Sequence, residues 1–199
     1  LVDAVAAELL TARLGRPAPR AARVAAVTTH SLPALKAYLA GERFLRQGRY
    51  EDAITAYERA VAQDSLFALA HYRISQAGSW AFRGDLSNRA AALASRHADR
   101  LPERERRLVL AHEDYRRGHA TAARAALQEL AALYPDDPEV WFRLGEVRLH
   151  FGPLEGWRIS EAREPFMRAT ALDPGSPAAL YHLAQLAALE ADTAAALRA

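Results

Sequence analysis

The chain has 199 residues, with 26 Lys and Arg, 24 Asp and Glu, and no cysteine. Its 46 alanines and 8% aromatic residues favour closely packed helices over a large sheet, because alanine has the highest helix propensity and strands prefer β-branched and aromatic residues. The near balance of charge argues against a nucleic-acid-binding surface, and the lack of cysteine excludes disulfides and thiolate metal sites.

Residues 1–30 are predicted to form an N-terminal helix and a linker. Apolar residues recur at helical spacing through 1–14, and Pro17 and Pro19 prevent the helix from continuing through 15–20. Because the sequence starts with Leu1 inside this helical pattern, we expect this segment to be the tail of an upstream domain.

From residue 31 onward one pattern recurs in the segments 37–65, 110–135 and 140–174. Each has a helix with a small residue in its middle, a turn containing Gly or His, a second helix with small residues, and a closing Pro or Ser. The last segment is longer than the others by about five residues, which fall in PLEGWRIS (153–160).

This pattern resembles the tetratricopeptide repeat family, in which a bulky residue and Leu-Gly mark the first helix, Ala and Phe the second, and Pro the end. Trp141, Gly145, Ala162, Phe166 and Pro174 carry the resemblance most fully. It covers about residues 34–199 and implies an all-α fold, an α-solenoid in which antiparallel helix pairs form a right-handed superhelix. We expect an array at 31–199 of four to five repeats, at about 34–67, 68–101, 102–137, 138–176 and 177–199.

Helix-start signals agree with this division. Asp137-Pro138 and Ser176-Pro177 each match an N-cap followed by proline at the first helical position. Ser65 and Asp85 are further cap candidates. Pro165 would fall about one turn inside a second helix, so we expect it to delay the start of that helix or to kink it.

The resemblance implies a concave groove lined by the first helices, where partners bind. One predicted row of groove residues comprises Tyr38, Tyr72, Val109, Phe142 and Tyr181. A second row, four residues on, comprises Glu42, Gln76, Glu113, Glu146 and Gln185. The ends of the first helices add Arg46, Trp80, Arg117 and His150.

An aromatic row beside an acidic row suits a protein or peptide segment with cationic and apolar side chains. The alternative is that the rings pack on neighbouring helices and the acids pair with arginines one turn away, as Glu42–Arg46 and Glu113–Arg117 would. Members of the family that bind chaperone tails hold a terminal carboxylate with Lys, Asn and Arg. Because Tyr and Glu stand at the matching positions here, we do not expect that specificity.

No catalytic or nucleotide-binding motif occurs, so we expect no enzyme activity, no cofactor and no metal ion. His112 and His119, with Glu113 and Asp114 between them, are the nearest approach to a metal site, but ordinary packing and surface roles are favoured. Trp157 in the insertion either folds back on the helices or is presented to a partner, with packing favoured.

Residues 24–75 also resemble the junction that leads into such arrays in large bacterial multidomain regulators, notably serine/threonine protein kinases. This implies a sensing or docking part of a signalling protein, with no membrane span in this chain and catalysis in another domain. We favour the cytoplasm, with the extracytoplasmic side of a membrane-anchored parent protein as the alternative. Other functions left open are self-assembly through terminal repeats, binding of a small molecule or lipid in the aromatic groove, and a hydrolase or transferase on a repeat scaffold.

Overall fold

Helices form every element of the part of the chain that the computed structural model describes, residues 24–25 and 28–196, which confirms the predicted all-α class. The predicted helix at 1–14 and the linker at 15–20 lie outside the described residues. The α-helices are α3 (Leu32–Arg46), α4 (Tyr50–Gln63), α5 (Ala68–Trp80), α6 (Gly84–Arg96), α7 (Glu103–Arg117), α8 (Ala120–Leu133), α9 (Pro138–Phe151), α10 (Arg163–Leu172) and α11 (Pro177–Ala196). Short 3-10 helices are η1 (Ala98–Arg100), η2 (Gly152–Leu154) and η3 (Ile159–Ala162).

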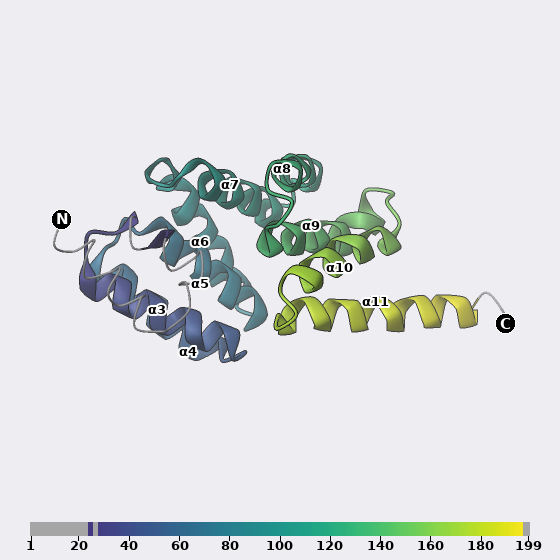
Figure 1. Cartoon of the computed structure of the whole chain (residues 1–199), viewed down its shortest axis with the longest axis horizontal. Coiled ribbons are helices and arrows are strands. Elements are labelled where there is room, and N and C mark those ends of the chain that lie inside the picture. The colour runs from purple at the N-terminus through teal and green to yellow at the C-terminus, as the bar shows by residue number, and fades with distance from the viewer. Residues whose placement is uncertain (1–23, 26–27, 197–199) are drawn as a thin grey trace. The chain divides into compact units, whose positions relative to one another are not determined.

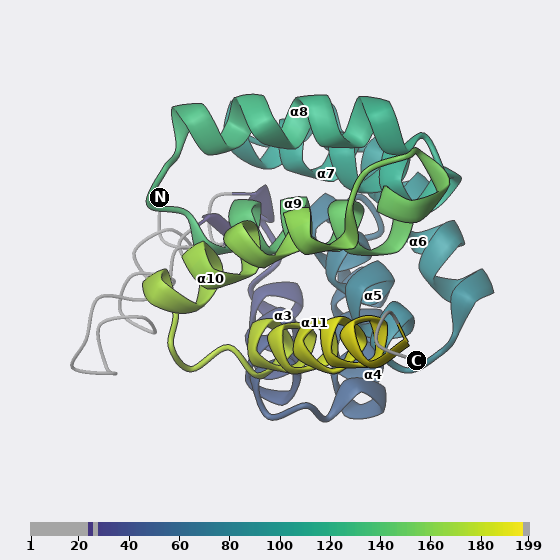
Figure 2. The ribbon, with the colours of Figure 1, turned by 90° about the vertical axis from the view of Figure 1, so that its right-hand side faces the viewer.

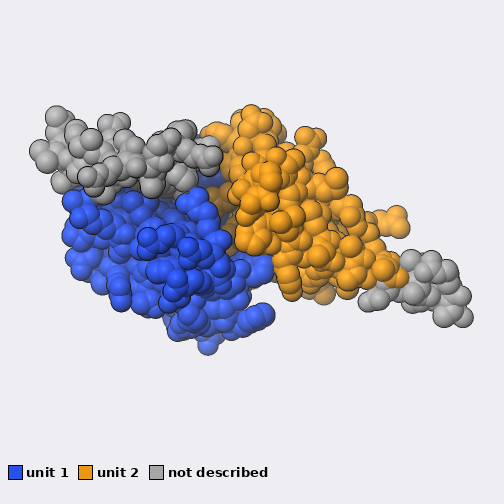
Figure 3. Space-filling model, turned by 60° about the horizontal axis from the view of Figure 1, so that its bottom comes forward, with its two compact units in different colours: residues 1–109 blue, residues 110–199 orange. Residues whose placement is uncertain are grey.

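The chain divides into two compact units, residues 1–109 and 110–199, and the boundary falls inside α7 (Figure 3). The predicted limits of the array and of its repeats stay predictions.

In the first unit, α3 packs on α4 and α5 packs on α6, and α4 also packs on α5 (Figure 1). Because turns of only three residues join the helices of each pair, the two helices of a pair are antiparallel. Gly48, with φ of +70°, ends α3 in the left-handed conformation that glycine adopts without strain. Phe82, with φ of +57°, takes the corresponding place after α5.

A close helix crossing explains the glycine in the middle of α3. A Cβ atom on Gly41 would lie 2.5 Å from Cε1 of Tyr57 on α4, so the buried tyrosine ring occupies the space of the missing side chain. The small residue of the first helix therefore faces the second helix and allows the two helices to approach closely.

In the second unit, α8 packs on α9, α9 on α10, and α10 on α11 (Figure 2). Phe166 on α10 fills the space beside Gly145 on α9, in the same way as Tyr57 does beside Gly41. The two crossings are built from equivalent residues of two different helix pairs.

Two of the predicted N-caps are confirmed. The side chain of Asp137 accepts hydrogen bonds from the backbone N–H groups of Glu139 and Val140, and Ser176 Oγ accepts one from Ala179. Ser65 and Asp85 are not caps, which corrects the prediction, because α5 begins only at Ala68 and Asp85 lies within the first turn of α6.

Pro165 delays its helix, which is one of the two outcomes expected. The 3-10 helix η3 precedes α10, and α10 begins at Arg163, so Pro165 is its third residue. In the first turn a backbone N–H has no intrahelical acceptor, and proline therefore costs little there.

Among the described residues, none of the helices combines the length and the apolar character that crossing a membrane requires.

Candidate functional site

The predicted aromatic row is mostly buried. Tyr38, Tyr72, Val109 and Phe142 are each at most 8% exposed, whereas Tyr181 on α11 is 57% exposed. The structure thus differs from the open face that we expected for the first four, and the rings of Tyr38 and Phe142 lie against rings of second helices. The ring centroids of Tyr38 and Tyr57 are 5.5 Å apart, and those of Phe142 and Phe166 are 5.7 Å apart. A binding role for the row stays a prediction.

In the first unit the second row forms a hydrogen-bonded bridge between α3 and α5. Glu42 Oε1 accepts from the hydroxyl of Tyr57 at 2.6 Å and from Nε of Arg73 at 2.8 Å. Arg73 Nη1 then donates to Gln76 Oε1 at 2.7 Å. The first helices of successive pairs therefore lie next to each other, and this polar bridge joins them.

Burial and the nearby carboxylate of Glu42 raise the pKa of Tyr57 well above its ordinary value. The phenol keeps its proton at neutral pH and donates a hydrogen bond to Glu42. The bridge therefore consists of a neutral donor, a cationic donor and one carboxylate that accepts from both.

The other glutamates of the row are also engaged by arginines. Glu113 pairs with Arg117 at 2.8 Å, one turn along α7, as the packing alternative expected. Glu42 pairs with Arg73 instead of Arg46, and Glu146 pairs with Arg143. These carboxylates are therefore less able to attract a cationic segment than their spacing indicated.

The residues at the ends of the first helices differ in exposure. Arg46, Arg117 and His150 are exposed, and Trp80 is half-buried. The indole of Trp80 stacks on the ring of Tyr50 at a centroid distance of 5.7 Å. The accessible charge at these helix ends is thus cationic.

The second unit brings together a cluster of nitrogen and oxygen ligands that we call the α9–α11 cluster, consisting of Glu146, His150 and His182. One donor atom from each side chain lies within 4.8 Å of the other two. Glu146 and His150 are predicted groove residues on α9. His182, on α11, was missed in the sequence, although it follows Tyr181 as Arg73 follows Tyr72.

The charge state of the cluster follows from its surroundings. Burial acts to raise the pKa of Glu146, but the guanidinium of Arg143 and the neighbouring histidines lower it to about 2. Burial lowers the pKa of His150, and Glu146 only partly opposes that effect. At neutral pH the cluster therefore contains a carboxylate and a neutral imidazole at His150.

The two histidines considered for a metal site do not form one together. His112 is buried, and burial together with Arg143 lowers its pKa to about 3. His119 lies on the exposed turn after α7, where its Nδ1 is 3.2 Å from Asp114 Oδ1. His112 therefore has a packing role, and His119 belongs to the surface.

The insertion folds back onto α8. The guanidinium carbon of Arg124 lies 3.8 Å from the centroid of the Trp157 ring, a cation–π contact. Thr121 Oγ1 donates to Glu155 at 3.0 Å, and the backbone N–H of Trp157 donates to the Gly152 carbonyl at 2.8 Å within the insertion. Trp157 is therefore packed, the favoured alternative.

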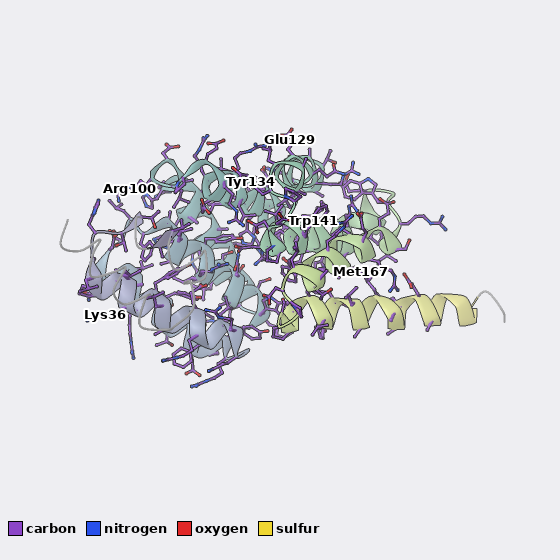
Figure 4. The ribbon with its side chains drawn as sticks, viewed as in Figure 1. Lys36, Arg100, Glu129, Tyr134, Trp141 and Met167 are labelled. Carbon is purple, nitrogen blue, oxygen red and sulfur yellow. The ribbon has the colours of Figure 1, made fainter. Side chains whose placement is uncertain are left out.

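A cavity of about 420 Å³ lies in the first unit. It is lined mainly by polar side chains and does not match the aromatic pocket that a small-molecule or lipid binder would need. Its lining residues are Thr28, His30, Ser31, Gln63, Asp64, Leu66 and Arg100 (Arg100 is labelled in Figure 4).

Two family models match the chain, one described as "TPR repeat" at residues 41–77 and one described as "Tetratricopeptide repeat" at residues 108–156. A similar solved structure, described as "Crystal structure of YrrB: a TPR protein with an unusual peptide-binding site", is 21% identical with a TM-score of 0.43, over 79% of this chain and 77% of that one. Another, described as "MamA RS-1 ArsTM double mutant", is 16% identical with a TM-score of 0.44, over 88% and 97%. No curated protein matches the chain.

Proposed function

With tetratricopeptide repeats at residues 41–77 and 108–156, we propose that the chain is a non-catalytic scaffold that binds a segment of a partner protein along its first helices. Repeats of this family generally mediate protein–protein interaction. We also propose, on the resemblance of residues 24–75, that the scaffold is the sensing or docking part of a larger bacterial signalling protein.

The observation that carries the proposal is the bridge from Glu42 through Arg73 to Gln76. It holds two first helices, α3 and α5, side by side. In the second unit, His182 Nε2 on α11 lies 3.8 Å from Glu146 Oε1 on α9, which relates two first helices in the same way. A surface shared by neighbouring first helices is what an extended segment needs if it is to contact several repeats.

The charges on the first helices of each unit, considered separately, favour an acidic partner segment over a cationic one. The side chain of Glu113 is 16% exposed, whereas that of its partner Arg117 is 61% exposed. Glu42 and Arg73 form an ion pair in which both side chains are nearly buried, whereas Arg46 is exposed. We therefore propose that Arg46 and Arg117 contact carboxylates of the partner and that ring stacking contributes little.

Selection from a displayed library of random peptides tests this proposal, with affinities of the enriched peptides measured by fluorescence polarisation. Arg46→Glu and Arg117→Glu reverse charges on first helices. The matched controls, Arg59→Glu and Arg168→Glu, reverse exposed charges on the second helices α4 and α10.

We expect acidic peptides to be enriched and the first-helix variants to weaken their binding about tenfold or more, which is about 1.4 kcal/mol. The second-helix variants should bind nearly as well as the original chain. Enrichment of no peptide, or an equal loss in the second-helix variants, would overturn the proposal.

Self-association is a second candidate, favoured by the exposed apolar side chains near the end of the described chain. Leu180 and Tyr181 on α11 are more than half exposed, and so is Met167 on α10 (Figure 4). Exposed apolar area of this kind is typical of contacts between proteins. Light scattering over a range of concentrations distinguishes a self-associating chain from a monomer that binds peptides.

A further inference from the structure

We propose that the α9–α11 cluster, Glu146, His150 and His182, binds a divalent first-row transition-metal ion such as zinc. The cluster supplies two imidazole nitrogens and one carboxylate oxygen within 4.8 Å of one another. This donor set occurs in zinc sites that have three protein ligands. The inference does not depend on peptide binding.

The distances are compatible with an ion at the centre. Bonds of about 2.0–2.1 Å in a tetrahedral site place ligand atoms roughly 3.3 Å apart. His182 Nε2 and Glu146 Oε1 are already 3.8 Å apart. The rings of His150 and His182 are nearly perpendicular, at 80°, with centroids 5.7 Å apart, so that both can direct a nitrogen toward one point. Small side-chain rotations would complete the geometry.

Neighbouring groups orient two of the ligands. Nδ1 of His182 lies 3.1 Å from Gln185 Oε1, which can only accept a hydrogen bond. With Nδ1 as the donor in this contact, Nε2 is the ring nitrogen on the side of Glu146, 3.8 Å from Oε1. The other oxygen of Glu146, Oε2, is held by Arg143, which leaves Oε1 on the side of the histidines. Such contacts fix the orientation of metal ligands in known sites.

The three side chains of the cluster differ in their exposure to solvent. His150 is exposed, while Glu146 and His182 are buried. An ion can therefore enter past His150, and its fourth position would be free for water or for a donor group of another molecule. Arg143 adds a positive charge beside the site, so we expect weaker binding than at a site with two carboxylates.

A bound ion would also add a link between two helices of the second unit. Glu146 and His150 belong to α9, and His182 belongs to α11, which packs mainly on α10. The ion would tie α11 directly to α9. Because it binds the folded state, it would stabilise this end of the chain in proportion to its concentration.

Calorimetric titration of the whole 199-residue chain with zinc chloride tests the proposal, together with the visible absorption of the cobalt-substituted protein and thermal unfolding with and without zinc. His150→Gln removes an exposed ligand with little effect on the fold. His119→Gln is the matched control, since His119 is an exposed histidine of the same unit outside the cluster.

We expect one zinc ion per chain, a cobalt spectrum of nitrogen and oxygen coordination, and a higher unfolding temperature with zinc. His150→Gln should abolish all three effects, His119→Gln should retain them, and Gln185→Ala should weaken binding about tenfold. If the original chain binds no zinc, or if His150→Gln binds it as well as the original chain does, the proposal is wrong.

Discussion

Phe166 of α10 occupies the space that a side chain at Gly145 of α9 would need: a Cβ atom there would lie 2.6 Å from Cε1 of the ring. Phe166 is fully buried and also stacks on His182, at a centroid distance of 4.9 Å. The ring therefore cannot move away without disturbing α11. Gly145 is required by this contact and not by its backbone conformation, because it lies within a regular helix.

Gly145→Ala should destabilise the chain by about 1–3 kcal/mol, since the methyl group overpacks the crossing with Phe166. Unfolding in urea, followed by circular dichroism, measures the change. Gly78→Ala is the control: its Cβ would meet Ser87 at an ordinary 3.4 Å, and alanine gains up to about 1 kcal/mol of helix propensity. Equal stability of the two variants would contradict the packing argument.

The crossings could be predicted from the sequence because they depend on local spacing. Gly41 and Gly145 stand at the middle of helical segments, and Asp137 precedes a proline, which are signals contained within a few residues. Such local signals do not show whether Ser65 caps α5. Asp64 beside it accepts from Thr29 Oγ1 at 2.6 Å and from the Leu66 N–H, and this turn moves the start of α5 to Ala68.

The burial of the predicted groove residues was harder to predict from the sequence than the helix crossings were. Helical periodicity places Tyr72 and Phe142 on one side of their helices, but it does not show how closely the neighbouring helices cover them. Both are buried, so replacing them by alanine would leave cavities and would not isolate a binding role. The repeat pattern already places residues of α11 in the same predicted rows as residues of α9, but it does not show that the side chain of His182 meets those of Glu146 and His150.

Phe82 is strained by its backbone conformation, since its φ of +57° falls where Gly48 and Gly118 stand in two other helix-pair turns. Its ring is 96% exposed, so packing does not compensate for the strain. Phe82→Gly should therefore stabilise the chain by about 0.5–1 kcal/mol, measured as a rise in the unfolding temperature.

Phe82→Ala is the matched variant, because it removes the exposed ring but keeps the Cβ atom that causes the strain. We expect its stability to stay close to that of the original chain. A gain as large as that of Phe82→Gly would show that the exposed ring, and not the backbone, is responsible.

Buried histidines should make the chain less stable in mild acid. The pKa of His112 is lowered to about 3, by burial first and then by Arg143, from an ordinary value of 6.5. The unfolded chain therefore takes up a proton below pH 6.5 that the folded chain does not. The stabilisation is complete above pH 6.5 and declines toward pH 3 by up to about 1.4 kcal/mol per pH unit. His71 and His150, whose pKa values burial also lowers, act in the same direction.

The free energy of unfolding in urea, measured at several pH values between about 7.5 and 5, checks this prediction. Glu146, with its pKa lowered to about 2, loses its contribution only below its ordinary value of 4.5, so it does not disturb this range. His112→Gln should give a shallower decline, whatever its effect at neutral pH, whereas the exposed His119→Gln should keep the original slope. If both variants retain the full slope, His112 is not the residue whose protonation opposes folding.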